Sequence, residues 1–132
     1  MIGEAATIPG AHISGRAPDF TTAVLVRDAI HLDQGSANQL YGVQRDDGYW
    51  TLGHGPGRML TMPTDLVRWI HEGLAIIVGH PGHHDARARV HVWCLYNPNG
   101  QTLNIVCGHA NVCVEGIDRL RILADWMGRA LS

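Results

Sequence analysis

The chain lacks lysine entirely and contains only one phenylalanine and three glutamates. All ten basic residues are arginine, and nine of the twelve acidic residues are aspartate. Arginine, alanine, glycine and aspartate have GC-rich codons, so we attribute this usage to a GC-rich genome; a bacterial or phage source is compatible with it, but the residues do not decide the origin. Selection of arginine for bidentate pairing with a partner would act on one surface only, whereas lysine is missing from the whole chain.

Long hydrophobic runs and a charge excess are also missing. The longest apolar run, 74–78, is far shorter than the roughly 20 residues that a membrane helix needs. The N-terminus lacks the positive segment of a signal peptide. Ten basic and twelve acidic residues give a formal net charge of -2, which argues against nucleic acid or a membrane as the partner. The odd number of cysteines, three, indicates a reduced, cytoplasmic protein.

The chain is long and hydrophobic enough for one domain. It has 132 residues, of which 45% are hydrophobic, and a chain of this size buries roughly two thirds of its unfolded surface. Residues 1–20 are rich in Gly, Ala, Pro and Thr, with Pro9 and Pro18 as breakers. We therefore predict an irregular N-terminal arm over residues 1–20 and a single α+β domain over residues 21–132.

Alternation of apolar and polar residues predicts that much of the chain forms strands. The segments Asp46–Gly48 and Asn97–Gly100 carry turn residues between β-forming stretches. A short continuous apolar run, such as 74–78, is typical of a buried strand. The candidate strands are residues 22–32, 40–45, 49–52, 58–62, 74–78, 89–96 and 101–107.

Helical spacing of apolar residues occurs in two places. Thr64 is the expected N-cap of a short helix that Gly73 would end. A longer helix over residues 115–131 has one apolar stripe, and Gly128 inside it suggests close packing at that point. The predicted fold class is α+β, with a mainly antiparallel sheet of about five or six strands and a long C-terminal helix packed on one face.

Nine histidines are a surplus for this length and, with the cysteines, form two candidate zinc sites. Imidazole, thiolate and carboxylate groups are the usual ligands of zinc. A solvated polar loop would explain the first segment equally, and buried core cysteines would explain the second. The candidate ligands are His80, His83, His84 and Asp85 in the first segment, and Cys94, Cys107, His109 and Cys113 in the second.

The second segment also permits a nucleophile. Cys113 lies just before the predicted C-terminal helix, where the helix dipole lowers the pKa of a thiol. His109 or His91 would act as its base, and Asn111 or Asp85 would orient that base. The local sequence carries no signature of a cysteine-hydrolase family.

Aromatic and arginine residues indicate a binding surface. The chain has four Trp and three Tyr, and these types are favoured at interfaces because an apolar body carries a polar tip. Adjacent residues of a strand point to opposite faces, so one of Tyr49 and Trp50 should be exposed. The candidate binding residues are Tyr49, Trp50, Arg87, Arg89, His91 and Trp93.

Two functions fit these patterns. The first is a small non-enzymatic module that binds another protein or itself, as an inhibitor, immunity factor or assembly accessory. The second is a metal-dependent or Cys/His hydrolase that uses the segment His80–Asp85 or Cys107–Cys113. Clustered imidazoles would also suit a pH sensor. Because no catalytic motif is complete, the sequence favours the binding module.

Overall fold

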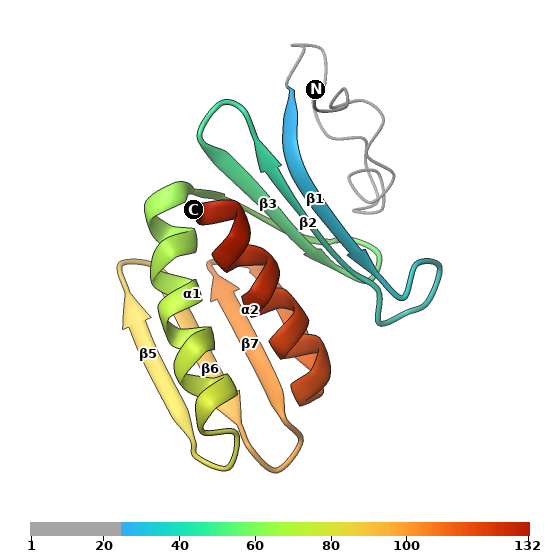
Figure 1. Ribbon diagram of the computed structural model, residues 1–132. Helices are drawn as coiled ribbons and strands as arrows, with labels where there is room; N and C mark the ends of the chain where they lie inside the picture. The colour runs from blue at the N-terminus through green and yellow to red at the C-terminus, as the bar shows by residue number, and fades with distance from the viewer. Residues whose placement is uncertain (1–24) are drawn as a thin grey trace. The chain divides into compact units, whose positions relative to one another are not determined.

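The computed structural model describes residues 25–132, which form eight strands and two helices (Figure 1). The described residues divide into two compact units, 25–64 and 65–132. The predicted arm, residues 1–20, lies outside the described residues, and the prediction of a single folding domain stays a prediction. The elements are β1 (Val26–Leu32), β2 (Leu40–Arg45), β3 (Tyr49–His54), β4 (Arg58–Pro63), α1 (Thr64–Gly79), β5 (Asp85–Arg89), β6 (Val92–Asn97), β7 (Thr102–Cys107), β8 (Ala110–Glu115) and α2 (Ile117–Leu131).

The first unit is a four-stranded antiparallel sheet in the order β1-β2-β3-β4. The expected Asp-Gly turn joins β2 to β3, and Gly48 has a φ of 88°, which glycine adopts without strain. Gly53 on β3 pairs with Tyr41 on β2, and the Tyr41 ring covers the place that a Cβ at Gly53 would take. Large apolar side chains on one face are buried, namely Leu40, Trp50, Leu52, Leu60 and Met62.

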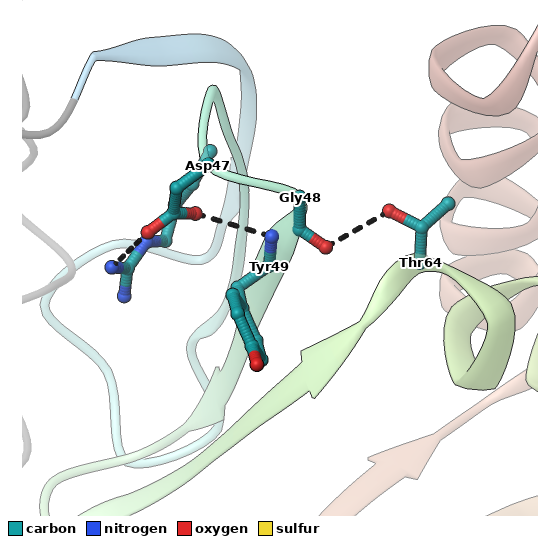
Figure 2. Close-up of polar contacts among 5 residues, drawn as sticks. Asp47, Gly48, Tyr49 and Thr64 are labelled. Atoms are coloured by element: carbon teal, nitrogen blue, oxygen red, sulfur yellow. Dashed lines mark hydrogen bonds and ion pairs between the residues drawn. The ribbon is translucent and has the colours of Figure 1, made fainter.

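Thr64 ties the start of α1 to the β2–β3 turn (Figure 2). Its backbone N–H and its hydroxyl both donate to the carbonyl oxygen of Gly48, at 3.2 and 3.0 Å. The same hydroxyl oxygen accepts a hydrogen bond from Trp50 Nε1 at 3.0 Å. Beside Gly48, the Asp47 carboxylate accepts from the Tyr49 N–H at 3.1 Å. Thr64, expected to precede and cap the helix, is its first residue, and its hydroxyl bonds the turn and the buried tryptophan.

The second unit combines a four-stranded antiparallel sheet, in the order β5-β6-β7-β8, with the two helices. Both helices lie over the same face of this sheet, which we call the inner face (Figure 1). Along β6, β7 and β8 every second side chain is buried on the inner face, namely Val92, Cys94, Tyr96, Leu103, Ile105, Val112 and Val114. The alternate side chains point to the opposite, outer face.

The turn between β6 and β7 holds the start of α2. Gln101 in that turn has a φ of 51°. Its Oε1 accepts a hydrogen bond from the Ile117 N–H at 3.1 Å, and its carbonyl oxygen accepts one from the Gly116 N–H at 2.9 Å. A helix N-terminus leaves its first amide groups without partners inside the helix, so Gln101 supplies an acceptor from a distant turn. The buried side of α2 carries Leu120, Leu123, Ala124, Trp126 and Met127.

The two helices approach each other closely at Gly128. A Cβ at Gly128 of α2 would lie 3.1 Å from Nε2 of His71 on α1. The close packing expected at this glycine is confirmed, and the neighbouring atoms belong to a side chain. Glycine lowers the helix propensity of α2 at this position, but the missing side chain leaves room for the His71 imidazole.

The prediction of an α+β fold with antiparallel strands and a C-terminal helix is confirmed. The prediction of one sheet with five or six strands is wrong, because the strands form two sheets of four. The predicted strand 89–96 is interrupted by a turn at residues 90 and 91. The edge strands β5 and β8 lie mostly in segments that the sequence does not predict to be strands.

The apolar run 74–78 belongs to α1 and not to a strand. Gly73 does not end the helix, because it lies inside it next to the side chain of Arg87 on β5. Within the run, Leu74 and Ile77 are buried whereas Ile76 is exposed, which is the spacing of one helix face.

Neither helix in the described part of the chain is long and apolar enough to cross a membrane.

We expect Thr64→Val to lower the free energy of unfolding by about 2 kcal/mol, because each net hydrogen bond contributes about 1 kcal/mol. The substitution keeps the shape of the side chain but removes the hydroxyl that Gly48 and Trp50 share. Thr64→Ser keeps the hydroxyl and is the control. Urea unfolding of the three proteins measures the effect, and equal stabilities for the Val and Ser variants would contradict it.

We expect the effect of Gly128→Ala to depend on His71. Alanine is about 1 kcal/mol better than glycine inside a helix, but the new Cβ would press on the imidazole. In the otherwise unchanged chain Gly128→Ala should therefore give no gain, whereas in a His71→Ala background it should stabilise by about 1 kcal/mol. Thermal unfolding of the four proteins measures this coupling. The same gain in both backgrounds would show that the contact is not tight.

Candidate functional site

The outer face of the second sheet is the candidate site. Strand register assigns its side chains, because residues opposite each other in an antiparallel pair share a face. The outer-face residues are Ala86, Ala88, Trp93, Leu95, Asn97, Thr102, Asn104, Val106, Asn111, Cys113 and Glu115. Glu115, at the end of β8, is the only charged residue among them. The face therefore offers apolar and neutral polar groups to a partner.

The most exposed apolar side chains of this face belong to the β5–β6 hairpin. Trp93 and Leu95 on β6 are 54% and 42% exposed. Opposite them on β5 lie Ala88 and Ala86, which are exposed as well. Because alanine side chains are short, Trp93 and Leu95 project further from the sheet than Ala86 and Ala88 beside them, and all four form one apolar surface at the edge of the sheet. We call these four residues the hairpin patch.

The tip of the same hairpin is also apolar and has an unusual backbone. Val90 at the turn is the most exposed large hydrophobic residue in the described part of the chain. His91, next to it, has a φ of 65°, a left-handed conformation that is uncommon for a residue other than glycine. The hairpin therefore presents apolar surface at its tip as well as on its outer face.

The structure separates the residues of the predicted binding surface. Trp50 is buried in the first unit, with 2% of its surface exposed, whereas Tyr49 is exposed. The expectation that one of these two aromatics is exposed is confirmed, but Trp50 has no surface to offer a partner. Arg87 and Arg89 pair with Cys94 and Val92, whose side chains are on the inner face, so both arginines point away from Trp93.

Both arginines are engaged on the inner face. Arg87 Nε donates to the Asp85 carboxylate at 3.0 Å, and the side chains of both residues are about three quarters buried. Arg89 lies 4.0 Å from the Asp65 carboxylate at the start of α1, and both of these side chains are largely exposed. The arginines of β5 therefore contact inner-face groups, and of the predicted residues on this strand pair only Trp93 belongs to the outer face.

The two histidine segments lie at opposite ends of the second sheet. His80, His83 and His84 precede β5, whose first residue pairs with Tyr96 at the far end of β6. The turns that hold His91 and His109 lie at the other end, where Val92 pairs with Cys107. Strands of this length separate the two ends by roughly 15 Å. The segments cannot combine into one site.

No ligand set is assembled within either segment. The rings of His80 and His83 meet edge to face with centroids 6.1 Å apart, and the Asp85 carboxylate is bound to Arg87. Among residues 25–132 no three His, Cys, Asp or Glu side chains lie close enough together to hold a metal ion. The zinc hypothesis gains no support from this arrangement.

Register also divides the three cysteines. Cys94 pairs with Ile105 and Cys107 with Val92, so both thiols belong to the inner face, whereas Cys113 pairs with Asn104 on the outer face. Cys113 lies inside β8, and α2 begins only at Ile117. It is therefore outside the first turn of the helix, where the dipole would act on it.

The thiol of Cys94 is buried and protonated. Burial raises the pKa of Cys94 from 9.0 to about 11; the positive charge of Arg87 opposes this increase and the negative charge of Asp85 adds to it. A thiolate, not a thiol, is the nucleophile in cysteine chemistry. Cys94 therefore has the properties of a core residue.

Leu95, Ala86 and Ala88 belong to the hairpin patch but not to the predicted surface. The signal for Leu95 is present in the sequence. Residues 92–96 are all apolar, so both faces of this strand carry apolar side chains. Because alternate side chains point to opposite faces, burial of Cys94 and Tyr96 on one face places Trp93 and Leu95 together on the other. The alanines carry no comparable signal, because β5 is short and follows a polar loop.

No protein-family model matches the chain, and no curated protein matches it. The function therefore has to be argued from the side chains themselves.

We expect Cys94 to be alkylated more slowly than Cys107 in the folded protein at neutral pH, because Cys94 is buried and its thiol stays protonated. Since folding raises this pKa, the neutral thiol favours the folded state. That contribution is complete below about pH 9 and is lost as the pH rises through about 11. Mass spectrometry of timed alkylation measures each cysteine, with the unfolded chain as control. Equal rates for Cys94 and Cys107 in the folded chain would contradict the assignment.

Proposed function

We propose that this protein is a non-enzymatic protein-binding module, of the inhibitor, immunity or assembly-accessory type, and that the hairpin patch is its contact surface. The observation that carries the proposal is the exposure of Trp93 and Leu95 on a sheet face with a single charged residue at its margin. Both helices cover the inner face of the same sheet (Figure 1), so the outer face is the one available to a partner.

The size of the apolar surface supports this proposal. Covering the exposed parts of Trp93 and Leu95 would remove on the order of 200 Å² of apolar area from water, a gross gain of about 5 kcal/mol. Loss of translational and rotational freedom on association offsets part of that gain. Tryptophan in a well-packed pocket is among the commonest energetic centres of protein interfaces. Trp93 is therefore the anchor of the proposed contact.

The chemistry of the face favours a protein over a nucleic acid. Nucleic-acid surfaces depend on arginine and lysine side chains that neutralise phosphates, and the outer-face positions include neither type. The arginines of β5 point to the inner face, where they contact aspartates. A neutral, largely apolar partner surface with hydrogen-bonding groups at its rim would match the asparagines and threonine of the outer face.

We expect Trp93→Ser combined with Leu95→Thr to abolish capture of the partner. Tagged full-length chain is incubated with extract of its host, and the proteins that co-purify are quantified for each variant. Both residues are exposed, so the double variant should unfold at nearly the same temperature as the unchanged chain.

The matched control is Ile122→Ser, which removes a similarly exposed apolar side chain from α2. The proposal requires at least one protein that co-purifies stoichiometrically with the unchanged chain and with the control but not with the double variant. If every co-purifying protein is retained by the double variant, or none is enriched at all, the proposed function is wrong.

A further inference from the structure

Among the described residues, β5 is an edge strand of the second sheet, and the side of α1 beside it carries exposed apolar residues. We infer that two copies of this chain associate about a twofold axis, with β5 of one copy pairing antiparallel with β5 of the other and the two α1 helices packing side by side above the junction. This contact uses residues other than Trp93 and Leu95.

The backbone of β5 is available for pairing. Among the described strands β5 has one neighbour, β6, on one side only. A two-residue turn joins the strands, so Arg89 and Val92 form the closing pair of the hairpin. Alternation along an antiparallel pair then directs the N–H and C=O groups of Ala86 and Ala88 away from β6. An extended strand can add to such an edge, and the small, exposed alanines leave it accessible.

Two contacts define which side of α1 lies above this edge. A Cβ at Gly73 would lie 3.1 Å from Cδ of Arg87 on β5, whereas His71 meets Gly128 on α2. The side of α1 that carries Gly73 is therefore its β5 side. The opposite side of the helix faces α2.

The β5 side of α1 is apolar. Trp69 and Ile76 are four residues before and three residues after Gly73, and Leu66 is seven residues before it, so all share the same side of the helix. Ile76 is 46% exposed, and Leu66 and Trp69 are partly exposed. An apolar row beside an open strand edge is the arrangement that a second copy with the same row would cover.

The charged residues at this edge are mostly paired. Arg87 lies 3.0 Å from Asp85 and Arg89 lies 4.0 Å from Asp65, whereas the exposed Glu72, one turn before Ile76 on α1, adds a further acid. If the twofold axis passes beside Arg87, Asp85 of one copy lies opposite Arg89 of the other. The two facing pairs of opposite charge favour the association. The two Arg87 residues face each other at the axis, and the Asp85 carboxylate of its own copy, at 3.0 Å, offsets the charge of each.

The same axis gives the helices a defined contact. Gly73 lies against the side chain of Arg87 in its own copy, so the middle of each α1 comes close to the axis. Trp69 of one helix then faces Ile76 of the other. All five residues of β5 are paired, with Ala86 opposite Ala88 of the second copy.

Sedimentation equilibrium of the full-length chain over a range of concentrations tests this inference. We expect a monomer–dimer equilibrium, weakened roughly tenfold or more by Ile76→Glu, which would place two carboxylates in the apolar contact. Ile122→Glu is the matched control, because Ile122 on α2 is 43% exposed and lies away from this edge. The control should dimerise like the unchanged chain.

A second variant addresses the strand. Ala88→Pro removes an N–H that points to the open edge, and proline is tolerated at such positions of edge strands. It should also weaken the dimer. Mixed chains carrying Ala86→Cys and Ala88→Cys should cross-link to each other more readily than either does to itself.

Two results would overturn the inference: a chain that stays monomeric at every concentration, or equal dimerisation by the Ile76→Glu and Ile122→Glu variants. Trp93→Ser with Leu95→Thr should leave the dimer intact while partner capture is lost, and Ile76→Glu should do the reverse. Failure of the dimer and failure of the proposed function are therefore distinguishable.

Discussion

The packing of both helices on one face of the second sheet is the constraint on which the rest of this unit depends (Figure 1). A strand sends alternate side chains to opposite faces, so the helices can bury only every second residue of β5–β8. The sequence of β6 is nevertheless apolar at both phases, Val-Trp-Cys-Leu-Tyr. Such a strand is typical of sheets that are covered on both sides. Trp93 and Leu95 are thus residues of a sheet interior whose second covering layer this unit does not supply.

The elements that could be predicted from the sequence depend on neighbouring residues. The Asp47-Gly48 turn and the stripe of α2 are local patterns, and both are present in the structure. The run 74–78 could not be assigned in this way, because five apolar residues fit a buried strand and a helix equally. The packing partners of this helix are remote in sequence: Gly73 lies against Arg87 of β5, and Leu74 and Ile77 are buried on one helix face.

The part of the candidate site that could be predicted follows from one rule: alternate side chains of a strand point to opposite faces of the sheet. Trp93 was found, and Leu95 follows from the same pattern once Cys94 and Tyr96 are buried. The predicted ligand clusters are not assembled among the described residues, because proximity in sequence is not proximity in space within a sheet. Cys107 and Cys113 are six residues apart, yet the β7–β8 register sends their side chains to opposite faces. Likewise, no local signal distinguishes Tyr49 from Trp50, since only the position of the core determines which of them is buried.

The residues of β5 connect the proposed surface with the inferred dimer. Its arginines contact aspartates on the inner face, whereas its short alanine side chains leave the outer face of β5 and its edge exposed. In the twofold arrangement the outer faces of two copies become continuous, and two alanine strands separate Trp93 of one copy from Trp93 of the other. Trp93 of one copy lies in the same row as Leu95 of the other, so three strand spacings and an offset of two residues place the tryptophans roughly 16 Å apart. A partner with a single pocket therefore binds one Trp93 whether or not the chain dimerises, because the dimer contact itself contains neither tryptophan.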